Sequence, residues 1–210
     1  MKLFLTSQTI SPTQGPHLMQ LVGKDKPQDI KIALIENAAD TYTEDRKAWV
    51  YDNRADIQSH GFQVDLVDLA DYQLGEAGLL SRLEAYDVIW LSGGNTYYLR
   101  WILHETGADS MIQDLARQGK VVGGASAGAI VVGPTLKHFE LADDPADAPE
   151  VTYDGLCLTD AVIIPHWGNE KYGEIMADAE KNLQSDGFET VHITDDQALA
   201  IDGSAQRVID

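Results

Sequence analysis

Short runs of apolar and β-branched residues alternate with longer amphipathic stretches along almost the whole chain. This alternation is typical of a parallel sheet whose strands are joined by crossover helices. We expect strands at 2–6, 30–36, 62–68, 88–92, 120–123, 161–165 and 190–193, and a closing hairpin of 198–202 with 206–209. Helices are expected at about 12–23, 43–60, 75–86, 96–104, 108–118, 126–132 and 170–186. The sequence therefore predicts an α/β three-layer sandwich with a mostly parallel central sheet, and we expect 1–210 to form one domain.

Composition narrows the classes of function. A net charge of -19 would repel nucleic acid and anionic membranes, so we expect neither as a partner. No apolar run reaches the ~18 residues of a membrane span, and 1–7 is too short for a signal peptide. Cys157 is the single cysteine, and no Cys and His cluster resembles a metal site. We expect a cytoplasmic protein that needs no metal or organic cofactor.

The segment 124–128, Gly-Ala-Ser-Ala-Gly, follows the strand expected at 120–123 and leads into a short small-residue helix. This layout predicts a nucleophile elbow, a tight turn that presents Ser126 between a strand and a helix. Glycines suit such a turn because a Cβ at those positions would collide with the joined elements. A structural strand-to-helix turn is the alternative interpretation.

Two further loops follow strand ends. Gly93-Gly94 comes after the strand at 88–92, and His166 comes after 161–165. Ligands bind beyond the carboxyl ends of the strands in open α/β sheets, so these loops and the elbow should meet at one edge of the sheet. A serine nucleophile needs a base, which His166 can supply, and one amide of the Gly93-Gly94 pair together with the Ala127 amide can hold an oxyanion.

The carboxylate that would orient the histidine stays open, because 34 acidic residues place candidates everywhere. Asp195 and Asp196, at the next strand end, can reach the same edge. The candidates between the serine and the histidine are Glu140, Asp143, Asp144, Asp147, Glu150, Asp154 and Asp160.

Three motifs in this order and spacing resemble a known family. They are 91–99 (Leu-Ser-Gly-Gly-Asn-Thr-Tyr-Tyr-Leu), 124–129 (Gly-Ala-Ser-Ala-Gly-Ala) and 164–169 (Ile-Pro-His-Trp-Gly-Asn). Together they resemble the aspartyl dipeptidases, the peptidase E family of serine peptidases, with cyanophycinase as a more distant member. The resemblance covers about 1–203 and implies a fold like that of class I glutamine amidotransferases.

The resemblance also implies roles. Ser126 would be the nucleophile and His166 the general base, with the Gly94 and Ala127 amides as the oxyanion hole. The acid would lie in the loop between serine and histidine, where the Asp-Pro region points to Asp143, with Asp144 and Glu140 as alternatives. The substrate would be a short peptide, and the family allows a homodimer. The residues expected to contact the substrate are Asn95, Thr96, Trp167 and Lys171.

The region after the histidine motif departs from the aspartyl-specific pattern. Those family members carry basic residues there, whereas this chain has Glu-Lys-Tyr-Gly-Glu at 170–174, with Lys171 as the nearby cation. A preference for amino-terminal aspartate therefore does not follow from the sequence. We expect a serine exopeptidase, dipeptidase-like, and keep two alternatives: an α/β-hydrolase esterase, and a non-catalytic binding or regulatory module on the same scaffold.

Overall fold

The computed structural model describes residues 1–75 and 78–210. Its strands lie close to the expected positions. They are β1 (Lys2–Thr6), β2 (Lys31–Ile35), β3 (Gln63–Leu66), β4 (Val88–Leu91), β5 (Val121–Ala125), β6 (Val162–Ile164), β7 (Thr190–His192), β8 (Ala198–Asp202) and β9 (Ala205–Ile209). The α-helices are α1 (Gly15–Val22), α2 (Ala48–Ser59), α3 (Leu79–Glu84), α4 (Thr96–Glu105), α5 (Ala108–Arg117), α6 (Ala127–Val131) and α7 (Gly173–Ser185).

Some boundaries differ from the expectation. The stretch expected as one helix at 43–60 contains a 3-10 turn, Glu44–Arg46, before α2 begins. The helix expected at 75–86 is shorter, and residues 76–77 of that expectation lie outside the described residues. Within the described ranges, no helix combines the length and the apolarity needed to cross a membrane.

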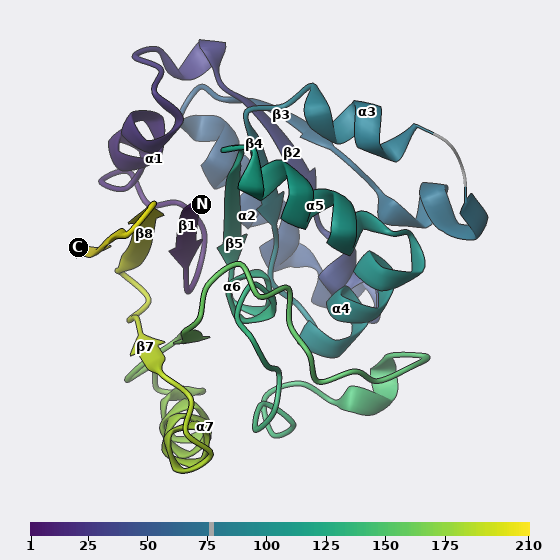
Figure 1. Cartoon of the computed structure of the whole chain (residues 1–210), viewed down its shortest axis with the longest axis vertical. Helices are drawn as coiled ribbons and strands as arrows, with labels where there is room; N and C mark the ends of the chain where they lie inside the picture. Colours follow the sequence, from purple (N-terminus) through teal and green to yellow (C-terminus); the bar gives the residue numbers. More distant parts are fainter. Residues whose placement is uncertain (76–77) are drawn as a thin grey trace.

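The central sheet has the strand order β3-β2-β4-β5-β1-β8-β9 (Figure 1). Strands β1 to β5 run parallel, whereas β8 and β9 join as an antiparallel hairpin. The predicted α/β class with a mostly parallel sheet is therefore confirmed. One expectation is wrong: β6 is not in this sheet but pairs in parallel with β7 in a separate two-stranded sheet.

Side-chain alternation along the strands produces two apolar layers. On β1, Leu3 and Leu5 point into one core, which the helices from α3 to α7 cover, whereas Phe4 points into the other. That second core packs against α1 and α2, through residues such as Leu18 and Ile57. Because both faces of the sheet are covered, its inner strands are apolar at successive positions.

The two ends of the chain meet in this sheet. Strand β1 lies between β5 and β8, so the first and the last strands lie close together (Figure 1). The segment after β1 passes the ends of β6 and β7, where Ser7 contacts residues that follow both strands. The Ser7 hydroxyl lies 3.0 Å from the Ile193 carbonyl oxygen and 2.9 Å from that of Thr194. These contacts tie the small sheet to the large one.

Candidate active site

The elbow at Ser126 is built as the sequence predicted, between β5 and α6. Ser126 has φ 50° and ψ -113°, a conformation that L-residues rarely adopt. A Cβ on Gly124 would lie 2.3 Å from the Gly128 carbonyl oxygen, and one on Gly128 would lie 2.0 Å from that of Leu91. Only glycine fits at either position, and the packing around the turn holds the serine in its unusual backbone conformation.

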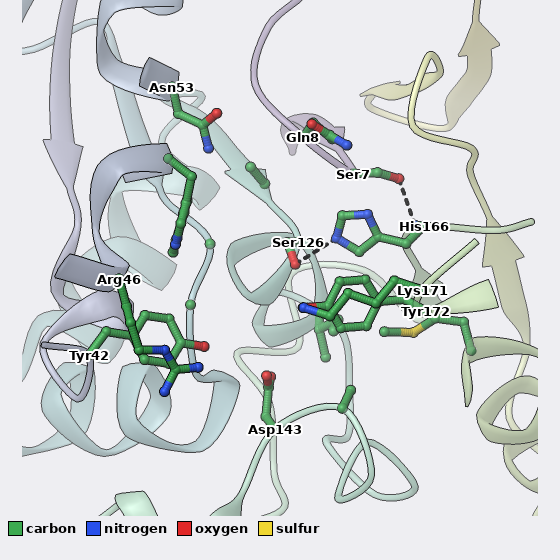
Figure 2. Close-up of a pocket in the computed structure, with 17 residues that line it drawn as sticks. Ser7, Gln8, Tyr42, Arg46, Asn53, Ser126, Asp143, His166, Lys171 and Tyr172 are labelled. Carbon is green, nitrogen blue, oxygen red and sulfur yellow. Dashed lines mark hydrogen bonds between the residues drawn. The ribbon is translucent and has the colours of Figure 1, made fainter. Parts of the chain in front are cut away.

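His166 faces the serine from the end of β6. Its Nε2 lies 3.0 Å from the Ser126 Oγ, and its Nδ1 lies 2.7 Å from Oδ1 of Asp195 (Figure 2 shows the serine and the histidine). Asp195 follows β7, the parallel neighbour of β6, so the two strand ends bring the imidazole and the carboxylate together. The three side chains form a continuous Ser-His-Asp chain of hydrogen bonds, although β6 lies outside the main sheet.

Neighbouring polar groups fix the histidine and its carboxylate. The His166 amide donates to the Ser7 Oγ at 2.9 Å, which holds the backbone of the histidine at its positive φ of 57°. Asn169 donates through Nδ2 to Oδ2 of Asp195 at 2.5 Å. Each oxygen of the carboxylate therefore has a partner, and the imidazole is held with Nε2 toward the serine.

The charge on Asp195 is stabilised by these contacts. Burial alone would raise the pKa of Asp195, but the hydrogen bonds from Asn169 and His166 outweigh it and hold the pKa below its ordinary value. An ionised carboxylate at Nδ1 keeps the proton on that nitrogen and leaves Nε2 free to accept the serine proton.

The expected acid, Asp143, makes no hydrogen bond or ion pair with His166. Its Oδ2 instead accepts from the Thr96 amide at 3.0 Å and from the Thr96 hydroxyl at 2.5 Å, at the start of α4. The expectation was wrong because it assumed that the acid precedes the histidine in the chain. The structure supplies the carboxylate from the strand end that follows β6.

The two alternative acids also lie away from the histidine. Oδ1 of Asp144 accepts from the Ala146 amide and caps the short turn of 145–147. Glu140 is exposed to solvent. The sequence did carry a signal for the observed partner, since Asp195 was noted at the end of a strand, but that position alone could not rank it above the other acidic residues.

The expected oxyanion groups lie beside the serine. Gly94 lines the cavity around Ser126, and its φ of 141° together with the Ala38 carbonyl, 2.2 Å from where a Cβ would lie, requires glycine. Ala127 follows the serine at the first position of α6. In the described part of the chain, neither amide donates a hydrogen bond to another protein group. Both N–H groups are therefore available to a ligand.

A cavity of about 520 Å³ opens around the serine, and Figure 2 shows its lining. Lys171, which we expect to contact the substrate, lines this cavity, with Nζ 2.7 Å from the Tyr172 hydroxyl and above that ring. Sequence reasoning missed the opposite wall, which comes from the segment before α2 and its first turns. Residues of this wall are Tyr42, Arg46, Trp49 and Asn53. No sequence pattern pointed to this wall, because its polar and aromatic residues are of the kinds found in an ordinary amphipathic helix.

Three residues expected to contact substrate have other roles. Asn95 is buried and caps α4 by accepting from the Tyr97 and Tyr98 amides. Thr96 is buried against Asp143, as described above. Trp167 lies outside the cavity lining and stacks on His192, with ring centroids 4.2 Å apart. Over the described residues, no group of three or more His, Cys, Asp or Glu side chains is placed to hold a metal ion.

A strand-turn-helix serine with an adjacent imidazole and carboxylate, inside an α/β sandwich, is the arrangement of a serine hydrolase. The comparison with protein families makes this more specific. The model of peptidase family S51 matches residues 3–209, so the chain belongs to peptidase family S51 and is a serine peptidase. The expected resemblance to the peptidase E family is confirmed.

Curated relatives carry related names. An uncharacterized peptidase of Listeria monocytogenes is 36% identical over 120 residues, which are 57% of this chain and 58% of that protein. One from Listeria innocua is 30% identical over 151 residues, covering 68% of this chain and 71% of the relative. Peptidase E of a Nostoc species is 32% identical over 139 residues, 66% of this chain and 53% of its own length. The alignments with the first and the third of these relatives thus span little more than half of the relative.

Solved structures share the fold. A Listeria monocytogenes protein provisionally assigned as peptidase E superposes with a TM-score of 0.84 at 28% identity, over 99% of this chain and 97% of that one. A peptidase from an acI-B1 Actinobacterium gives a TM-score of 0.71 at 21% identity, over 99% of this chain and 86% of its own. At 21% identity, the similarity to the Actinobacterium peptidase shows a shared fold and nothing more.

Proposed function

We propose that this protein is a dipeptidase-like serine exopeptidase that hydrolyses short peptides through Ser126, His166 and Asp195. The observation that carries the proposal is the hydrogen-bonded chain from Oγ of the serine to Nε2 of the histidine at 3.0 Å, and from Nδ1 to the aspartate at 2.7 Å. Ser126 and His166 line a cavity of about 520 Å³, a size typical of sites for small ligands.

The reaction would proceed by acyl transfer. Oγ of Ser126 attacks the peptide carbonyl carbon while its proton moves to Nε2 of His166. The resulting oxyanion accepts hydrogen bonds from the Gly94 and Ala127 amides. The carbon–nitrogen bond then breaks, and the imidazolium gives its proton to the leaving amine. The acyl-serine is then hydrolysed by the same steps: water attacks its carbonyl carbon while giving a proton to His166, and the serine leaves with that proton, which releases the acid. Asp195 stabilises the imidazolium in both halves of the reaction.

Charges in the cavity support a substrate that is short and carries its own charged ends. Arg46 lies over the Tyr42 ring, 5.1 Å from its centroid, and Lys171 lies over that of Tyr172 at 4.5 Å. Within the described ranges, neither cation is in an ion pair with a carboxylate. A dipeptide carboxylate would meet local positive charge here, despite the acidic surface of the protein as a whole.

Turnover of X-Ala and X-Leu dipeptides, including Asp-Leu, tests the proposal. We expect the wild type to hydrolyse members of this series and Ser126→Ala to lose activity by roughly 10⁶-fold while it keeps its fold. Amidated dipeptides measure the contribution of the free carboxylate, which Arg46→Gln should diminish. A serine-directed phosphonate should label Ser126 in the folded wild type.

Two outcomes would contradict the proposal and support one of the alternatives. Hydrolysis of p-nitrophenyl acetate together with inertness toward every dipeptide would support the esterase alternative. Failure of the phosphonate to label Ser126, with no turnover of either substrate type, would support a binding module.

A further inference from the structure

The imidazole of His166 is supported on its face as well as at its edge. Its two nitrogens face Ser126 and Asp195, as described above. Its ring lies against the ring of Tyr172, with the two centroids 5.3 Å apart and the planes inclined by 33° (Figure 2). Tyr172 also lines the cavity around the serine. An aromatic ring therefore lies against the base of the proposed reaction.

One side chain sets the positions of both this ring and the carboxylate. Oδ1 of Asn169 accepts from the Lys171 amide at 2.8 Å and from the Tyr172 amide at 3.1 Å. Nδ2 of the same residue donates to Oδ2 of Asp195. At the far end of the ring, the Tyr172 hydroxyl accepts from Nζ of Lys171 at 2.7 Å. The ring is thus held at both ends beside the imidazole.

The charge of the imidazole changes during the proposed reaction. When His166 takes the serine proton it becomes a cation, and the negative face of an aromatic ring attracts a cation within about 6 Å of its centroid. The separation of 5.3 Å from the Tyr172 ring meets this limit. A neutral imidazole gains less from the contact, so the ring favours the state that forms as the serine attacks.

Charged groups from three segments also act on this imidazole. Asp195, which follows β7, faces Nδ1 and favours the cation. Asp143, on the loop after α6, attracts the cation through its negative charge. Lys171, ahead of α7, lines the same cavity and opposes the cation. The Tyr172 ring favours the cation without adding a net charge to the cavity.

We propose that Tyr172 is a positioning residue that stabilises the imidazolium of His166 through the face of its ring. The inference rests on the proposed function, since the imidazolium is the one formed during acyl transfer. The hydroxyl holds the ring in place, whereas the ring acts on the histidine. Asn169 holds the ring and the carboxylate of Asp195 in one arrangement.

The protonation of His166 tests the inference without requiring turnover. We would label histidine Cε1 with ¹³C in the full chain and assign the signal with His166→Gln. The signal would be followed by NMR from about pH 4 to 9, on both sides of the ordinary histidine value. The variants are Tyr172→Leu, Tyr172→Phe and replacement of Tyr172 by pentafluorophenylalanine, whose ring keeps its shape but loses the negative face.

We expect the pH at which His166 protonates to fall by about 0.5 to 1 pH unit in Tyr172→Leu and in the pentafluorophenylalanine variant, because the imidazolium loses the attraction of the ring. Tyr172→Phe keeps the negative face and should restore the wild-type titration. Opening the site to water would raise this pH instead, because solvation favours the charged form. Lost packing alone therefore predicts the opposite change.

Steady-state kinetics give a second readout. We expect kcat for the best dipeptide to fall by about 5- to 30-fold in Tyr172→Leu, with less change in KM, because the contact is strongest in the transition state. Tyr153→Leu is the matched control, since Tyr153 packs edge-on against Tyr97 and is not among the described residues that line the cavity. This variant should keep the His166 titration and kcat of the wild type.

An unchanged or raised protonation pH in Tyr172→Leu, or equal falls in the phenylalanine and pentafluorophenylalanine variants, would overturn the inference. The pentafluorophenylalanine variant keeps the shape of the ring, so it decides the question if Tyr172→Leu fails to fold. Phosphonate labelling of Ser126 and turnover of dipeptides test the proposed function separately. An active enzyme whose His166 titrates alike in every variant would keep its catalytic assignment and lose only the role of Tyr172.

Discussion

Asp195 and Asp143 are two carboxylates in one site with opposite environments. Asp195 receives hydrogen bonds at both oxygens and has a lowered pKa, whereas Asp143 accepts hydrogen bonds from described residues at one oxygen alone and has a raised pKa. Carboxylates whose pKa values are pushed apart commonly divide the work of a site. Here the first is suited to hold a charged imidazole, whereas the second is held by Thr96 at the wall of the cavity.

Asp195→Asn should remove the electrostatic support of His166 while keeping its shape. We expect kcat for the best dipeptide to fall by about 10⁴-fold, because an amide stabilises neither the required tautomer nor the imidazolium. Steady-state kinetics measure the loss. Asp196→Asn is the control, since it makes the same change one residue farther along. A loss of less than about tenfold in Asp195→Asn would contradict the assigned role.

Asp143→Asn should stabilise the protein at neutral pH, because it removes a buried carboxyl whose pKa is raised. Because the folded-state pKa of Asp143 is raised, its destabilising effect is absent below its ordinary value of 3.8 and develops as the pH rises through the folded-state pKa. Urea unfolding from about pH 3 to 7 should show a variant whose stability advantage appears only at the higher pH. A variant less stable than the wild type at pH 7 would show that the Thr96 contacts outweigh burial.

At the scale of elements, the site depends on the close crossing of β4, β5 and α6. Glycines at 124 and 128 allow this crossing, because any side chain would enter the backbone of a neighbouring element. The collision involves main-chain atoms, which cannot move aside as the end of a flexible side chain can. Ser126 is therefore held by the packing beneath it.

Gly128→Ala tests this packing. A Cβ at this position would lie 2.0 Å from the Leu91 carbonyl oxygen, so β4 and α6 would have to separate. We expect the free energy of unfolding to fall by about 3 kcal/mol or more, with loss of phosphonate labelling. Gly119→Ala is the comparison, because its φ of 96° is strained but open space surrounds it; its cost should be about 1–2 kcal/mol. Equal losses in the two variants would exclude collision as the cause.

The sequence predicted local features well and long-range pairing poorly. The alternation of apolar runs located the strands, and the glycines around Ser126 identified the elbow because the whole pattern lies within residues 124–128. The partner of His166 depends on how β7 pairs with β6, a contact between distant segments that no residue pattern encodes. For the same reason sequence reasoning missed the cavity wall formed by Tyr42, Arg46, Trp49 and Asn53. Only the folded chain brings this wall opposite His166.

Across the whole molecule, acidic charge dominates. The chain has 34 Asp and Glu against 15 Lys and Arg. Several of the cations are used in ion pairs, such as those of Arg54 with Glu36 and Arg100 with Asp109, so they offset little of the remaining repulsion. Such an imbalance destabilises a compact state through self-repulsion. The homodimer allowed by the family resemblance stays a prediction.

Salt should therefore stabilise this protein. Raising NaCl from about 0.02 M to about 0.5 M shortens the screening length to a few ångströms, which weakens the repulsion between distant carboxylates. We expect Tm, measured by calorimetry, to rise by several degrees. Glucose at equal osmolality controls for effects that do not involve charge. A fall in Tm with salt would mean that surface ion pairs contribute more than the net repulsion costs.

Ser7, Ser126, His166 and Asp195 are spread over almost the entire length of the chain, yet they form one hydrogen-bonded cluster. During synthesis, a ribosome that has translated the elbow and the histidine has still not made the aspartate. A nascent or prematurely terminated product would thus hold the serine and the imidazole without the carboxylate that orients the imidazole. The complete cluster can form only when translation has passed residue 195 and the last strands have docked beside the first.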